Sequence, residues 1–72
     1  MPILRVAIDI PLPQLFDYTA EDAQAEDIGR CVRVPFGSSE KIGIIETVLF
    51  EAEAPLNLKN ITEIIDQEPV FT

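Results

Sequence analysis

The run from Lys41 to Phe50 constrains the fold more than any other part of the chain, because almost all of its residues favour β-structure. Its β-prone members are Ile42, Ile44, Ile45, Thr47, Val48, Leu49 and Phe50. Alternation places positions 42, 44, 46, 48 and 50 on one face and positions 43, 45, 47 and 49 on the other. Both faces are mostly apolar, which predicts a central strand, and Gly43 is expected to mark a bulge or a sharp bend.

Four other runs also have the pattern of short strands. Residues 3–10 alternate cleanly, with Leu4, Val6, Ile8 and Ile10 on one face, until Pro11 and Pro13 end the ladder. Residues 15–19 predict a second strand and residues 31–36 a third. Residues 58–66 predict the last strand, with a bulge near its end where Ile64 and Ile65 break the alternation.

The connections between these runs carry turn signals. Residues 20–29 predict a loop or one frayed helical turn, and Gly29 is free to take positive φ where the chain re-enters the sheet. Residues 37–39 predict a hairpin connection, and residues 51–57 a loop. No segment has the pattern of an amphipathic helix. The expected fold is mostly β, a small curled sheet or OB-like barrel of about five to six short strands.

The bulk properties define a small acidic domain. The chain has 72 residues, a formal net charge of −8 and a single cysteine. This length allows at most one domain, and we expect it to span residues 1–72. There is no apolar run of membrane-spanning length, no signal peptide and no internal disulfide, so we expect a cytoplasmic protein with no membrane partner. The apolar end at Val70 and Phe71 suggests the front piece of a longer protein.

The residue types argue against an enzyme. With no histidine in the chain, a Ser-His-Asp triad, a Cys-His pair and a histidine metal site are all excluded. Cys31 lies within a strand pattern and is expected to be structural. The acids between Glu21 and Asp27 match no calcium loop and predict a solvated, mobile loop. The glycines lack the spacing of a phosphate-binding loop.

Two stretches are expected to form one small pocket. In Phe16-Asp17-Tyr18, two aromatic rings that we expect to be exposed flank a carboxylate. In the stretch from Arg33 to Gly37, a strand ends at a proline and a glycine then allows close approach to the backbone. The rings could stack on a nucleobase while Asp17 accepts a hydrogen bond from a sugar hydroxyl or a base amine. In a plainer interpretation the rings are core or sheet-edge residues and Asp17 is merely exposed beside them.

Several motifs follow one another along the chain, and they are Val6-Ala7, Pro11-Leu12-Pro13, Phe16-Asp17-Tyr18, Gly29, Val32 to Gly37, Ile42-Gly43-Ile44, Leu58-Lys59, Asp66 and Glu68 to Thr72. Together they resemble a known family, the amino-terminal domain of the bacterial replication-restart helicases of the PriA type, also called primosomal protein N′. Each motif alone is short, but the combination is specific and extends over the whole chain.

This resemblance implies a module that binds the DNA 3′ end of a nascent leading strand at a stalled or branched replication fork. It implies a 3′-end pocket made by Phe16, Asp17, Tyr18, Gly37 and Lys59. ATP, Mg and structural Zn would belong to the parent helicase and none of them to this fragment. The implied partners are DNA, the helicase domains of the same chain and other primosome proteins, in the bacterial nucleoid region.

A second hypothesis comes from a different class of protein. In it, the chain is a non-catalytic β-module for protein–protein interaction, whose aromatics are core residues and whose acidic surface meets a basic partner. The net charge of −8 favours this alternative, because nucleic-acid binders are usually basic. Any phosphate contact would have to be local.

Overall fold

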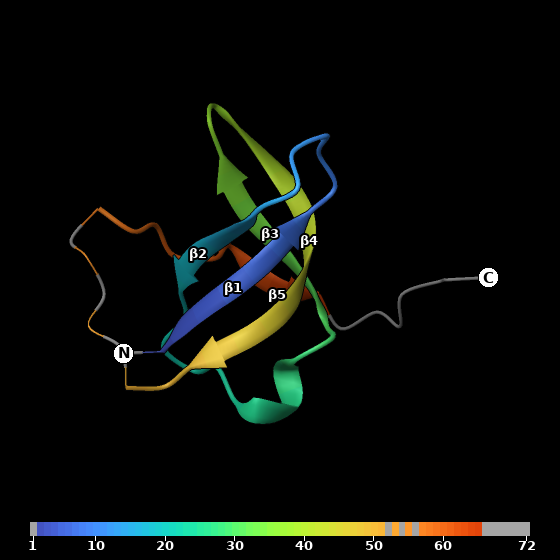
Figure 1. The fold of residues 1–72 in the computed structure, drawn as a ribbon. Helices are drawn as coiled ribbons and strands as arrows, with labels where there is room; N and C mark the ends of the chain where they lie inside the picture. The colour runs from blue at the N-terminus through green and yellow to red at the C-terminus, as the bar shows by residue number, and fades with distance from the viewer. Residues whose placement is uncertain (1, 52, 54, 56, 66–72) are drawn as a thin grey trace.

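The structure is a computed structural model that describes residues 2–51, 53, 55 and 57–65. It forms one antiparallel five-stranded sheet that curls strongly, in the order β2-β1-β4-β3-β5 (Figure 1). The elements are β1 (Ile3–Ile8), β2 (Leu15–Thr19), the 3₁₀ helix η1 (Ala25–Asp27), β3 (Cys31–Phe36), β4 (Ser39–Leu49) and β5 (Glu63–Ile65). The mostly β, curled-sheet prediction is therefore confirmed.

The strand β4 is central, as its two apolar faces predicted, and it pairs with β1 on one side and β3 on the other. The alternation along it is broken at Glu46. Arg5 of β1 pairs with Thr47, whereas the next residue Val6 pairs with Ile45, so Glu46 is an extra residue on the β4 side. The prediction of one unbroken alternation from 42 to 50 is therefore wrong beyond Ile45.

Gly43 does not mark the bulge; it marks a close approach between β4 and β1. A Cβ atom at this position would lie 2.5 Å from Cγ1 of Val6 and 2.7 Å from the carbonyl oxygen of Ala7. Real Cβ atoms do not approach other atoms so closely, so only glycine fits here without a shift of β1. The small residue thus lets the centre of the sheet curl tightly.

The core lies on the concave face of the curled sheet. Its members are Leu4, Val6, Ile8, Tyr18, Ala20, Ala23, Val32, Val34, Ile45 and Val48. The residues contributed by β1 and β3 are those that alternation predicted for one face. β1 and β3 are not neighbours in the sheet, yet their buried side chains belong to the same core cluster. The sheet therefore curls around its own core.

The sheet stays open between its two edge strands, β2 and β5. The only isolated β-bridge across this opening within the described residues is a parallel bridge of Thr19 to Asn60. The Thr19 amide donates to the carbonyl oxygen of Lys59 at 3.0 Å, and the Ile61 amide donates to the carbonyl oxygen of Thr19 at 3.0 Å. The segment before β5 therefore crosses the end of β2 without forming a full ladder, and the molecule is a curled sheet rather than a closed barrel.

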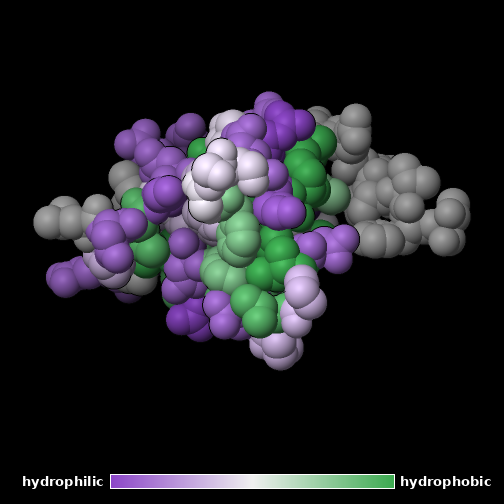
Figure 2. Space-filling view, turned by 90° about the horizontal axis from the view of Figure 1, so that it is seen from above, coloured by the Kyte–Doolittle hydropathy of each residue, from purple (hydrophilic) through white to green (hydrophobic). Residues whose placement is uncertain are grey.

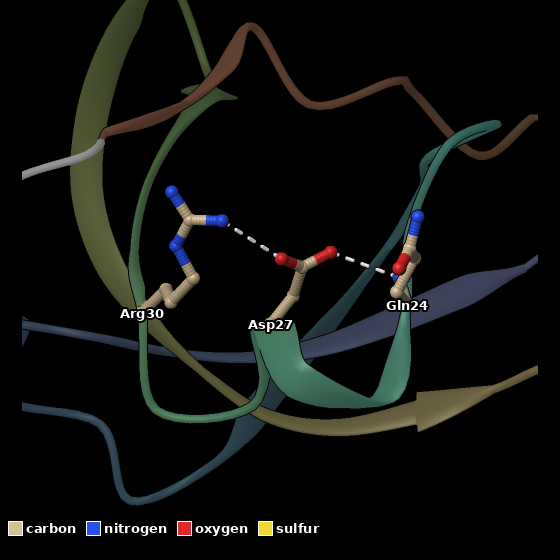
Figure 3. A network of polar contacts seen from close by, with 3 residues as sticks. All are labelled: Gln24, Asp27 and Arg30. Atoms are coloured by element: carbon tan, nitrogen blue, oxygen red, sulfur yellow. Dashed lines mark hydrogen bonds and ion pairs between the residues drawn. The ribbon is translucent and has the colours of Figure 1, made fainter.

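The acidic segment before β3 is better ordered than predicted. Asp27, at the end of η1, is only 5% exposed. Its carboxylate accepts a hydrogen bond from the backbone N–H of Gln24 at 2.8 Å and one from the Arg30 guanidinium at 2.9 Å (Figure 3). Ala20 and Ala23 are buried in the core. The prediction of a solvated loop is thus wrong for Asp27, whereas the other three acids, Glu21, Asp22 and Glu26, are exposed.

Two strands are shorter than their sequence patterns. β1 ends at Ile8 instead of residue 10, and β5 covers only Glu63–Ile65 of the predicted residues 58–66. Asp66 and the Val70-Phe71 pair lie outside the described residues. No helix among the described residues is long and apolar enough to cross a membrane. The same residues contain no cluster of three or more His, Cys, Asp or Glu that could hold a metal ion.

Candidate nucleic-acid interface

An open hollow of about 400 Å³ lies where the curled sheet fails to close. Three segments line it, and they come from β2, the end of β3 and the stretch before β5. Its lining residues are Leu15, Phe16, Asp17, Tyr18, Pro35, Phe36, Gly37, Asn57, Leu58 and Lys59. Phe16-Asp17-Tyr18 and the Pro35 to Gly37 part of the second stretch border one hollow, as predicted, whereas Arg33 and Val34 do not line it. All five predicted site residues border the hollow, and their role in binding stays a prediction.

The aromatic wall of the hollow is a pair of phenylalanines. The rings of Phe16 and Phe36 meet edge to face, with centroids 5.2 Å apart and planes at 88°. Both residues are half-buried and pack against the core. The contact joins β2 to β3 across the open side of the sheet, so the rings are held in place before any ligand arrives. Each ring keeps part of its surface exposed to the hollow.

Tyr18 does not present an open ring, contrary to the expectation of two exposed aromatics. It is 6% exposed and belongs to the core cluster. Its hydroxyl donates a hydrogen bond to the carbonyl oxygen of Pro35 at 2.9 Å. Burial raises the pKa of the Tyr18 phenol above its ordinary value, since the phenolate would lose its hydration. Tyr18 therefore supports the floor of the hollow and does not act as a free stacking surface.

Asp17 points to the face of the sheet opposite its aromatic neighbours, as alternation predicts. It is paired with Arg5 of β1, and Nε of Arg5 lies 3.3 Å from Oδ1 of Asp17. Both side chains are partly exposed, at 49% for Arg5 and 37% for Asp17. The carboxylate is thus accessible to a ligand at the rim of the hollow and already has one cationic neighbour.

The backbone of β2 also faces the hollow at Asp17. Thr19 directs its amide and carbonyl away from β1, toward Lys59 and Ile61. In an antiparallel pair, residues two apart direct their peptide groups to the same edge. The N–H and C=O of Asp17 therefore point to the open edge as well, where the hollow lies. Such an edge offers one donor and one acceptor to a ligand.

Gly37 and Lys59 complete the opposite rim. Gly37 has φ of 63°, which favours glycine, and nothing lies within 4 Å of the place where a Cβ would sit. The space above its backbone is open. Lys59 is exposed, and its ammonium group has no carboxylate partner in the part of the chain that the structure describes. The rim therefore combines bare backbone with an available cation.

Sequence reasoning missed some of the lining. Asn57 and Leu58 border the hollow, although the sequence predicts Asn57 in a loop and Leu58 at the start of the last strand. Alternation places Arg5 on the face of β1 opposite Leu4, Val6 and Ile8, and no motif linked it to the site. Its contact with Asp17 depends on the β1–β2 register, which the sequence predicts only if the hairpin turn is known.

The surface chemistry of this end of the molecule is mixed. Figure 2 shows it from above, from the side of the two loops that connect β1 to β2 and β3 to β4. Hydrophobic residues gather in the middle of this view and hydrophilic residues surround them. The lining of the hollow is likewise mixed, with apolar Leu15, Phe16 and Phe36 beside polar Asp17 and Lys59, which suits a ligand that has one flat apolar face and several polar groups, such as a nucleotide.

Comparison with known proteins decides the family. The sequence profile of the PriA 3′DNA-binding domain, or 3′BD, matches residues 5–72. The chain belongs to this family. A 3′BD is a DNA-binding domain rather than a catalytic one, so DNA is the partner and the resemblance seen in the motifs is confirmed.

Two curated relatives extend over the whole chain. Replication restart protein PriA of Haemophilus influenzae is 40% identical over 73 aligned positions. Replication restart protein PriA of Buchnera aphidicola is 33% identical over the same length. The chain is fully covered in both alignments but spans only 10% of each relative. The rest of those proteins has no counterpart in this chain.

Proposed function

We propose that the hollow receives the 3′-terminal nucleotide of a DNA strand and distinguishes a free 3′-hydroxyl from other ends. The observation that carries this proposal is the convergence of Asp17, the phenylalanine pair, Gly37 and Lys59 on one open edge of the sheet. The 3′BD family supports DNA as the ligand. The strand would be the nascent leading strand at a stalled or branched replication fork, and the domain would bind it as part of a replication-restart helicase.

Each residue has a role that its chemistry supports. The exposed parts of Phe16 and Phe36 would contact the base, an interaction worth roughly 1–3 kcal/mol when a base stacks on an aromatic ring. Asp17 would accept a hydrogen bond from the 3′-hydroxyl, and Lys59 would meet the last internucleotide phosphate. The open space above Gly37 would let the sugar lie against the backbone. Tyr18 would act indirectly, because it fixes the position of Pro35.

The identity of the terminal group is the sharpest test. Three fluorescent strands of one sequence are compared by anisotropy at low salt: one with a 3′-hydroxyl, one with a 3′-phosphate and one closed into a circle. The 3′-hydroxyl strand should bind best. The 3′-phosphate strand should bind worst, because a dianion would be placed against a carboxylate in a domain of net charge −8. Equal affinities for the three strands would contradict end recognition.

Two variants connect this ranking to Asp17. Asp17→Ala should weaken binding of the 3′-hydroxyl strand by roughly 10- to 150-fold, the value of a hydrogen bond to a charged acceptor. Its effect on the circular strand should be small. Glu46→Ala is the matched control, because Glu46 is an exposed acid of the same sheet that does not line the hollow. Both variants remove one negative charge, so only the site should separate them.

A second function is favoured by a feature of the outer face. An apolar row crosses all five strands there, because the register aligns Leu15, Ala7, Ile44, Cys31 and Ile65. A partly exposed apolar row is typical of a protein-binding surface. With a net charge of −8, the domain would suit a basic partner protein.

An amide chemical-shift titration with short single-stranded DNA distinguishes the two functions. Shifts gathered at residues 16–18 and 37 support the 3′-end module. An unperturbed spectrum at millimolar DNA supports the protein-interaction module.

The wider setting is also a proposal. The relatives are replication restart proteins about ten times as long as this chain. We infer that the domain works beside helicase domains of its own chain and other primosome proteins, in the bacterial cytoplasm and at the nucleoid. ATP, Mg and structural Zn would be needed by the parent protein and not by this domain. Pull-down of the full-length protein with and without these residues tests the partners.

A further inference from the structure

Arg5 is the cation placed beside the carboxylate that the proposed function uses. It lies directly opposite Asp17 in the β1–β2 ladder. The peptide groups of Asp17 point away from β1, so the two residues form a non-hydrogen-bonded pair, the type in which facing side chains are closest. Nε of Arg5 is 3.3 Å from Oδ1 of Asp17. The contact is therefore built into the register of the hairpin.

The other basic residues have different places in the fold. The chain has five Lys and Arg residues in all. Arg30 is bound to Asp27 beside η1, and Arg33 is bound to Glu63 at the far edge of the sheet. Lys59 lies at the opposite rim of the hollow, and Lys41 lies outside its lining. Among the basic residues, and within the part of the chain that the structure describes, Arg5 is the one that forms an ion pair with Asp17.

This pairing has two physical consequences for a carboxylate that must bind a hydroxyl. An exposed aspartate side chain is free to rotate, and a contact at Oδ1 restricts it to one orientation while leaving Oδ2 available as an acceptor. A nearby guanidinium also offsets the repulsion between the carboxylate and the phosphates of the approaching strand. Both effects act through Asp17 and need no contact between Arg5 and DNA.

We propose that Arg5 is a positioning residue for 3′-end recognition, which orients the Asp17 carboxylate and reduces its repulsion of the DNA strand. The proposal rests on the proposed function, because it requires Asp17 to bind the 3′-hydroxyl. It extends the site beyond Phe16, Asp17, Tyr18, Gly37 and Lys59. It also explains how an acidic domain can offer a carboxylate to a polyanion.

A double-mutant cycle tests this role. Affinity for the 3′-hydroxyl strand is measured for the wild type, Arg5→Met, Asp17→Asn and the double variant. Arg5→Met should weaken binding about two- to fivefold when Asp17 is present, the size expected for the loss of one exposed ion pair. In the Asp17→Asn background the same substitution should change the affinity by less than a factor of about 1.5, because no carboxylate remains for Arg5 to orient, and this departure from additivity measures the coupling between the two residues. Arg5→Lys should restore part of the loss, since the charge stays but the planar geometry does not.

The outcomes separate the possible roles of Arg5. An equal loss in both backgrounds would mean that Arg5 contacts a phosphate directly and would overturn the positioning role. An unchanged affinity in Arg5→Met would overturn it as well. Arg33→Met is the matched control, because it removes the same charge and breaks an ion pair whose two residues do not line the hollow. Thermal melting of each variant shows that the fold is retained.

The failure of this inference can be told from failure of the proposed function. If the wild type binds hydroxyl, phosphate and circular strands equally, end recognition is wrong and Arg5 has nothing to position. If the wild type ranks the three strands as expected but the cycle shows no coupling, only the role of Arg5 is wrong. Both measurements use the same strands and the same protein.

Discussion

Tyr18 donates a hydrogen bond from its hydroxyl to the carbonyl oxygen of Pro35, 2.9 Å away, and so joins two strands that are not neighbours in the sheet. β2 is an edge strand and β3 lies three places away from it. The bond crosses the open side of the curled sheet, next to the contact between Phe16 and Phe36. These two contacts hold the walls of the hollow at a fixed separation.

Removing this bond should loosen the hollow. Tyr18→Phe keeps the ring and deletes only the hydroxyl, so the free energy of unfolding should fall by about 1 kcal/mol. In a domain of this size, that corresponds to a melting temperature roughly 4–8 °C lower. Phe50→Leu, at an exposed position, is the control and should change the melting temperature little. Equal melting of Tyr18→Phe and the wild type would show that the bond contributes nothing.

The raised pKa of Tyr18 also predicts how stability changes with pH. The folded state holds the phenol proton more tightly than the unfolded state, whose pKa is about 10. The contribution of Tyr18 is therefore fully present below pH 10 and is lost as pH rises toward the folded-state pKa. Tyr18 is the only tyrosine, so absorbance at 295 nm reports it alone. Its titration midpoint should drop to about 10 in denaturant, and Tyr18→Phe should have a flatter stability profile above pH 10.

Two substitutions at Gly37 separate the effect of its backbone conformation from the effect of the open space above it. Its φ of 63° penalises a β-branched residue, so Gly37→Val should destabilise the fold by about 1–2 kcal/mol. Gly37→Asn should cost less, because asparagine tolerates this conformation. Both substitutions place a side chain above the backbone, where the terminal sugar would lie, and both should weaken DNA binding. Normal binding by the stable Gly37→Asn variant would remove Gly37 from the site.

Asp27 has a structural role that should be independent of DNA. Its carboxylate is buried and accepts hydrogen bonds from the backbone N–H of Gln24 and from the Arg30 guanidinium (Figure 3). Asp27→Ala should lower the free energy of unfolding by about 2 kcal/mol, since hydrogen bonds to a charged group are strong. Asp22→Ala, an exposed acid in the same segment, should change it by less than about 0.5 kcal/mol. Chemical denaturation of the two variants checks the difference.

The sequence was most informative where one local rule determined the outcome. The bounds of β2 and β3 were predicted as found, because alternating β-prone residues end there at loops or glycine. The positive φ of Gly29 followed from turn chemistry. The shared pocket followed from two stretches that each combine an aromatic residue with a break in regular structure.

The rest depended on contacts between distant parts of the chain. The bulge at Glu46 leaves no mark in the β4 sequence, because the residues on both sides of it are β-prone. Gly43 looked like the irregular residue, but its role comes from the approach of Val6 and Ala7. Register and packing decide such features, and one sequence does not display them. Asp27 is the exception, because its hydrogen-bond partners Gln24 and Arg30 are local, three residues away on each side.

Lys59 offers a test of how the acidic domain contacts phosphate. Its carbonyl oxygen accepts the Thr19 amide at 3.0 Å, which fixes its backbone beside β2, while its ammonium group is exposed at the rim. Lys59→Met should weaken binding of the 3′-hydroxyl strand about two- to fivefold, the effect expected of one exposed charge contact. The slope of log K against log salt should become shallower by about 0.7, since one phosphate contact is lost.

Lys41→Met is the matched control for this prediction. Lys41 is also exposed, and its replacement gives the same net charge, but it does not line the hollow. If the loss of binding came from the overall charge alone, the two variants would bind DNA equally weakly. We expect Lys41→Met to keep the salt slope of the wild type, which should be roughly −1 to −2 for the few phosphates this site can contact. A slope of −4 or steeper in the wild type would require a basic groove, whereas Lys59 is the only basic residue among the described residues that lines the hollow.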